Sequence, residues 1–255
     1  MYIEYFDGVV GQFSGGITSH EHDSVGVLVY DPEHPKDGAG LIDGTDAYSA
    51  QALHNLHLRG FGERSLVFAG STHAHRDHVI EQLGDTPHFI GYGGRDILAD
   101  GDYFDQTCFL TPGGPARIPN PQLWGNGWEA QIGRARLWVR QPRVPWHAPG
   151  SVAVGIAIGG KRLGILGDLA EGGFSTLAHA IPDPDLLREN IEDLMEEDFT
   201  DVVIGHCVNR PTPNPSNSYL KALLSRVLDE PIITHDGYYR TFIGPEQPAE
   251  LPQSS

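Results

Sequence analysis

The stretch SLVFAGSTHAHRDHVI, residues 65–80, places three histidines and one aspartate within six residues, directly after an apolar run. The apolar run predicts a short buried strand, and the polar residues fall in the loop that follows it. Side chains two positions apart on an extended segment point the same way, so His73 and His75 can bind one metal ion. Asp77 and His78 follow where the chain must turn, and they can bind a second ion beside the first. Imidazole and carboxylate are ligands of zinc, iron and manganese, so the pattern predicts a metal-binding loop.

Four side chains are too few for two ions, and further ligands are expected where other apolar strands end. Three residues meet this criterion. His147 stands just before the apolar run at 151–158, Asp168 ends KRLGILGD, and His206 ends DVVIGH. A carboxylate has two oxygens, so Asp168 could bridge both ions.

The distribution of apolar residues predicts an α/β fold. Runs that end in turn residues predict strands at 23–31, 39–45, 65–70, 87–92, 134–141, 151–160, 161–168 and 201–206. Helical spacing predicts helices at 47–60, 182–198 and 216–230. This order indicates two sheets flanked by helices, a four-layer αββα sandwich, in one domain over residues 1–255. The stretch Asp102–Glu129, rich in Pro, Gly and aromatic residues, is predicted to be a long irregular excursion.

Composition disfavours several classes of protein. With 17 Lys and Arg against 34 Asp and Glu, the net charge is −17, and no basic cluster is present that would bind nucleic acid. Two cysteines, Cys108 and Cys207, do not make a disulfide framework. The N-terminal residues MYIEYFDGVVGQF lack the pattern of a signal peptide, and no apolar run is long enough to span a membrane. We therefore expect a cytoplasmic protein that acts on a small molecule and that could form homo-oligomers.

The motifs together resemble the metallo-β-lactamase-fold hydrolase superfamily, whose signature is His-x-His-x-Asp-His followed by a His, a bridging Asp and a last His. WHAPGS (146–151) is similar to the family segment around the third histidine, and LIDGT (41–45) to the end of an early strand. The resemblance implies two divalent ions, zinc by default, with iron or manganese as alternatives. It implies these ligands: His73, His75 and His147 for the first ion, Asp77, His78 and His206 for the second, and Asp168 between them. Asp43 and Thr72 would orient the ligands.

A hydroxide held between two such ions would attack a carbonyl or phosphoryl group, with Asp77 moving a proton. The β-lactamases of the superfamily carry cysteine or serine where this chain has Asp168, which disfavours β-lactam hydrolysis. We therefore predict hydrolysis of a small ester, thioester or lactone, as in glyoxalase II-like thioesterases and acyl-homoserine lactonases. Three alternatives remain open: a mononuclear iron dioxygenase of a sulfur substrate, a phosphodiesterase or nuclease, and a non-catalytic binding protein on the same fold.

Two tryptophans and two histidines near the predicted cleft are candidates for substrate contacts. Trp124 and Trp128 lie in the excursion and could form an apolar wall at the cleft. His20 and His22 precede the predicted strand at 23–31, in a turn that often borders the cleft in the family. Packing of the tryptophans onto the sandwich, and solvent exposure of these histidines, are the alternatives.

Overall fold

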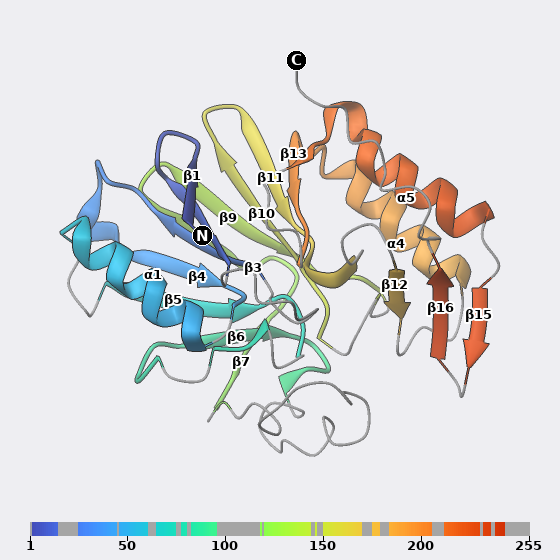
Figure 1. Cartoon of the computed structure of the whole chain (residues 1–255), viewed down its shortest axis with the longest axis horizontal. Coiled ribbons are helices and arrows are strands. Elements are labelled where there is room, and N and C mark those ends of the chain that lie inside the picture. The colour runs from blue at the N-terminus through green and yellow to red at the C-terminus, as the bar shows by residue number, and fades with distance from the viewer. Residues whose placement is uncertain are drawn as a thin grey trace.

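In the computed structural model, every predicted strand and helix falls within the described residues, apart from a few terminal positions. The described residues are 2–14, 25–44, 46–60, 65–74, 78–80, 83–95, 118, 120–143, 146, 150–169, 175–178, 184–205, 212–229, 232–235 and 238–242. The α/β fold with two large sheets that the sequence predicts is confirmed (Figure 1). The predicted strands and helices are all present, with ends shifted by no more than a few residues.

Seven strands of the described residues form the first sheet, in the order in which they occur in the chain. They are β1 (Tyr2–Tyr5), β2 (Val10–Ser14), β3 (Val25–Tyr30), β4 (Ala39–Ile42), β5 (Leu66–Ser71), β6 (His88–Gly91) and β7 (Gln122–Trp124). Strands β1 to β4 pair antiparallel, whereas β4, β5, β6 and β7 pair parallel. Parallel strands end at a common edge, so the residues after β4, β5 and β6 come together there.

Six strands of the described part form the second sheet, in the order β14-β13-β11-β10-β9-β8. They are β8 (Glu129–Ile132), β9 (Ala135–Arg140), β10 (Ala153–Ile158), β11 (Lys161–Ile165), β13 (Asp201–Val203) and β14 (Thr212–Pro213). Gly159 and Gly160, both at positive φ, make the tight turn between β10 and β11. Because β11 and β13 are parallel, residues 166–169 and 204–205 also leave the sheet at one edge.

Three apolar clusters of described residues pack the sheets and helices together. Strand β3 is buried on both faces, with Val25, Val27 and Val29 in the cluster between the two sheets and Leu28 in the cluster beneath helix α1 (Asp46–Leu58). On the far side, helices α4 (Pro184–Glu196) and α5 (Ser218–Asp229) cover the second sheet (Figure 1), and Ile191 and Leu220 belong to the third cluster. Within the described part of the chain, no helix combines the length and apolar composition needed to cross a membrane.

Several elements differ from the sequence-based prediction. A third sheet of three described strands, β12 (Ser175–Ala178), β16 (Tyr238–Phe242) and β15 (Ile232–His235), was not predicted. Nor were β1, β2, β14 and the short 3-10 helices η1 (Pro35–Asp37), η3 (Gly167–Leu169) and η4 (Pro215–Asn217). The predicted irregular excursion Asp102–Glu129 is corrected in part. Residues 122–124 form β7 and Glu129 begins β8, because each finds a sheet edge with which to pair. Residues 102–117 and 119 lie outside the described residues.

An ion pair between the buried Asp31 and the partly exposed Arg134 joins the two sheets away from the predicted metal loop. Asp31 follows β3, and both of its oxygens accept hydrogen bonds from the Arg134 guanidinium, at 2.9 and 3.0 Å, in the turn between β8 and β9. Burial pushes the pKa of Asp31 upward, but hydrogen bonds from Arg134, the Glu33 amide and His34 outweigh it and hold the pKa well below its usual range. The carboxylate is thus ionised in the folded protein and fixes the β8–β9 turn to the first sheet.

Replacing Asp31 with Ala is expected to lower the free energy of unfolding by about 2 kcal/mol, since a charge-assisted pair is lost and Arg134 is left without its main partner. Urea denaturation measures this change. Glu33→Ala is the matched control, because Glu33 contacts the same arginine at 3.4 Å from an exposed position and should alter stability by no more than roughly 0.5 kcal/mol. Equal effects of the two variants would contradict the assignment.

Candidate metal centre

Strand ends from both sheets bring together three of the predicted ligands. His73 follows β5, His78 lies on the loop beyond it, and Asp168 follows β11 in η3. All three are buried, and one ligand atom from each lies within 4.8 Å of the others. Side chains 90 residues apart in the sequence therefore converge at the meeting edge of the two sheets.

Asp168 lies between the two histidines. Its Oδ1 is 3.1 Å from Nε2 of His78, and its Oδ2 is 3.6 Å from Nε2 of His73. The centroids of the two imidazole rings are 4.2 Å apart. Each oxygen of one carboxylate therefore faces a different histidine, which is the arrangement that a bridging ligand requires.

Asp43, at the end of β4, positions both imidazole rings from their Nδ1 side, opposite the Nε2 atoms that face Asp168. Its carboxylate accepts hydrogen bonds from the Thr72 amide at 2.6 Å, the Thr72 hydroxyl at 2.7 Å and Nδ1 of His78 at 3.1 Å. Because the Thr72 hydroxyl uses its proton on Asp43, it accepts from Nδ1 of His73, at 3.3 Å. Nδ1 of both histidines therefore carries a proton. In the neutral form of each ring, the Nε2 lone pair then points toward Asp168.

This donor set fits a divalent cation. Two imidazole lone pairs and two carboxylate oxygens facing one another in a buried site repel, and a cation between them converts the repulsion into coordination. Gly205, the residue before His206, leaves the space that the cluster needs. A Cβ atom at Gly205 would overlap Oδ1 of Asp168 and lie 2.9 Å from Cε1 of His78. Sequence reasoning missed Gly205, although a glycine directly before a candidate ligand is a detectable signal.

The remaining predicted site residues divide into two groups. His75, Asp77, His147, His206, His20 and His22 lie outside the described residues. Trp124 is wholly buried in the cluster between the sheets, packed against Phe89 and Trp128 with centroid distances of 6.2 and 5.6 Å. Its predicted role in substrate contact is therefore corrected to a role in the core. Trp128 is half-buried against the same cluster, so its contact with substrate stays a prediction.

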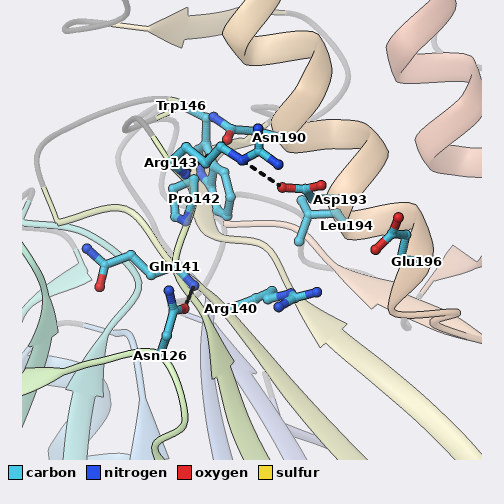
Figure 2. Close-up of a pocket in the computed structure, with 10 residues that line it drawn as sticks. All are labelled: Asn126, Arg140, Gln141, Pro142, Arg143, Trp146, Asn190, Asp193, Leu194 and Glu196. Atoms are coloured by element: carbon cyan, nitrogen blue, oxygen red, sulfur yellow. Dashed lines mark hydrogen bonds and ion pairs between the residues drawn. The ribbon is translucent and has the colours of Figure 1, made fainter.

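A polar pocket of about 350 Å³ lies beside the segment that leads to His147 (Figure 2). Trp146 forms one wall, and Arg143 contacts Asp193 on α4 with 3.7 Å between Nε and Oδ2. Arg140 and Glu196 also line it, so the pocket carries charges of both signs. None of the described candidate ligands lines this pocket.

A second group of possible ligand atoms, from Asp31, Glu33 and His34, is already engaged. Both oxygens of Asp31 accept hydrogen bonds from Arg134, and the arginine occupies the place that a cation would take. Among the described residues, the cluster around Asp168 is therefore the better candidate for a metal centre.

Comparison with known proteins gives the fold a name. No family model and no curated protein sequence matches the chain, but solved structures do. Rm3 metallo-β-lactamase is similar with a TM-score of 0.62 at 16% identity, covering 89% of this chain and 91% of that one. A B3 metallo-β-lactamase with an active-site glutamic acid has a TM-score of 0.61 at 20% identity, with 88% of each chain covered. The metallo-β-lactamase with a HARLDQ motif from Cronobacter sakazakii has a TM-score of 0.55 at 19% identity, covering 72% and 71%. The chain therefore has the metallo-β-lactamase fold.

Proposed function

We propose that the protein is a metal-dependent hydrolase with a dinuclear site, acting on a small ester, thioester or lactone. The observation that carries the proposal is the position of Asp168, whose two oxygens face the Nε2 atoms of His73 and His78. A carboxylate so placed can share its charge between two cations. The solved structures of the same fold support the hydrolase class, while the type of bond cleaved is our inference from the residues.

The proposed ligands follow the sequence motif. His73, His75 and His147 would hold one ion, Asp77, His78 and His206 the other, and Asp168 would join them. Two bound divalent ions would lower the pKa of a water molecule and polarise the substrate oxygen. The chain's own groups have separate tasks. Asp43 and Thr72 keep both imidazoles in the tautomer that leaves Nε2 available, and Asp77 would accept or return the proton of the attacking water.

Two features favour esters, thioesters and lactones over other bonds. Asp168 stands where the β-lactamases of the superfamily have cysteine or serine, so a carboxylate would be available here to hold both ions. The net charge of −17 repels a polyanionic nucleic acid and does not hinder a small neutral acyl compound.

The proposal is tested by measuring metal content and turnover together. We expect about two transition-metal ions per chain, because seven ligands exceed the four that one tetrahedral ion uses. The substrate panel contains an aryl ester, an acyl thioester, an acyl-homoserine lactone, a cephalosporin and an aryl phosphodiester. One of the first three should give the highest kcat/KM, and Asp77→Asn should abolish most of that turnover while the first ion stays bound.

Three results would overturn the proposal. One ion per chain under metal excess would exclude the dinuclear site. Preferential hydrolysis of the cephalosporin or the phosphodiester would exclude the proposed substrate class. Oxygen consumption with a thiol substrate would indicate the dioxygenase alternative.

A further inference from the structure

A buried hydroxyl connects the candidate ligand His78 to a histidine that the metal motif does not contain. Oγ of Ser71, the last residue of β5, is 2.7 Å from the main-chain oxygen of His78 and 2.9 Å from Nε2 of His88, the first residue of β6. Ser71 and His78 are fully buried and His88 is 5% exposed. The three residues form a chain of hydrogen bonds at the edge where β5 and β6 run parallel.

The direction of each hydrogen bond follows from the protons available. A carbonyl oxygen only accepts, so the Ser71 hydroxyl must donate its single proton to His78. Ser71 can then only accept from His88, and Nε2 of His88 carries the proton. Burial lowers the pKa of His88 to about 4, against an opposing effect of the Ile80 backbone, so the ring is neutral at pH 7. At neutral pH, His88 therefore donates one hydrogen bond, from Nε2 to the Ser71 hydroxyl.

The serine fixes a part of His78 that Asp43 does not reach. Asp43 holds the imidazole through Nδ1, whereas Ser71 holds the main-chain carbonyl of the same residue. With both ends fixed, the ring cannot move relative to Asp168 without breaking a buried hydrogen bond. Residues 75–77, with the candidate ligands His75 and Asp77, lie between this fixed point and His73.

We propose that His88 is a positioning residue of the metal centre, acting through Ser71 on the loop that ends at His78. This inference rests on the metal site of the proposed function, and it adds a residue that contacts no ion and no substrate. It predicts that loss of the His88 donor weakens metal binding even though the ligands are unchanged, as is found when residues behind metal ligands are replaced.

The test uses Co²⁺ alone as the probe, with affinity measured by competition against a chromophoric chelator and geometry by the visible absorption of the bound ion. His88→Leu removes the donor and should weaken Co²⁺ binding roughly tenfold to a hundredfold and change the spectrum. His88→Gln places an amide N–H at a similar reach, and a neighbouring pocket of about 360 Å³, which His88 lines, leaves room for it. Glutamine should restore affinity to within about threefold of wild type.

Ser71→Ala, alone and combined with His88→Leu, shows whether Ser71 and His88 act through the same chain of hydrogen bonds. Ser71→Ala should weaken Co²⁺ binding as His88→Leu does, and combining the two should add little, because either change alone breaks the same chain of hydrogen bonds. His57→Leu, at an exposed position on α1, is the control for loss of a histidine and should leave affinity unchanged.

Wild-type Co²⁺ affinity and spectrum in His88→Leu would overturn the proposal. The proposal would also be overturned if His88→Gln bound Co²⁺ as weakly as His88→Leu while the two metal-free variants melted at the same temperature. General destabilisation, and not the missing donor, would then explain the loss of affinity. A protein that binds Co²⁺ but hydrolyses none of the panel would refute the proposed function and leave this test intact. A wild-type protein that binds no Co²⁺ would refute both.

Discussion

Asp168→Asn is expected to lower kcat/KM for the best ester, thioester or lactone by about a thousandfold, which corresponds to roughly 4 kcal/mol of lost transition-state stabilisation. The carboxylate presents one oxygen to each of His73 and His78. An amide has a single oxygen, and its NH₂ group would face one of the two proposed cations. We therefore also expect the metal content to fall from about two ions per chain to about one.

Mass spectrometry of the metal content and steady-state kinetics on the same preparation measure both effects. Asp185→Asn is the matched control, because it removes one carboxylate from an exposed position on α4, where Asp185 pairs with Arg188. It should leave both quantities unchanged. Two ions per chain with kcat/KM within threefold of wild type would show that Asp168 does not bridge.

Gly205→Ala is expected to weaken metal binding by about a hundredfold, the upper end of the loss found when the groups that orient metal ligands are disturbed. The new methyl group would overlap Oδ1 of Asp168 and crowd the His78 ring. The main chain cannot retreat easily, since the Gly205 amide donates to the Gly167 carbonyl at 2.8 Å and the Gly205 carbonyl accepts from the Val25 amide at 2.6 Å. Asp168 must therefore move away from the position that faces both histidines.

Gly125→Ala is the control for the added methyl group, because a Cβ atom there meets nothing within 4 Å. Metal affinity and the melting temperature of the metal-free protein should be measured for both variants. Weakened binding with a nearly unchanged melting temperature is the expected result for Gly205→Ala. Wild-type affinity would mean that the cluster is not the metal centre.

Local patterns were sufficient to predict the strands that carry the site. A ligand at the end of an apolar run is recognisable because the run marks a buried strand and the polar residue marks its exit from the sheet. His73, His78 and Asp168 were identified in this way, and the structure brings them together. The positions of His75, Asp77, His147 and His206 stay predictions.

Packing between distant segments could not be predicted. The sequence of the excursion does not show whether its aromatic side chains pack into the core or line the cleft. Trp124 is buried because Gly70 on β5 has no side chain where the indole lies. The hydrogen bonds of Ser71 to His78 and His88 depend on the alignment of β5 with β6, which no single segment encodes. The third sheet was missed because β12 pairs with a strand more than 60 residues later in the chain.

The anchoring of Trp124 has a consequence for how this protein can diversify. Strand β7 lies directly beside β6, so the chain between Arg95 and Ile118 starts and finishes near two neighbouring strands whose positions the core determines. Doubling the length of such a connection costs only about 0.6 kcal/mol in closure entropy. Insertions, deletions and wholesale exchange of that connection should therefore be tolerated during evolution. Such changes would leave the strands that lead to His73, His78 and Asp168 in place.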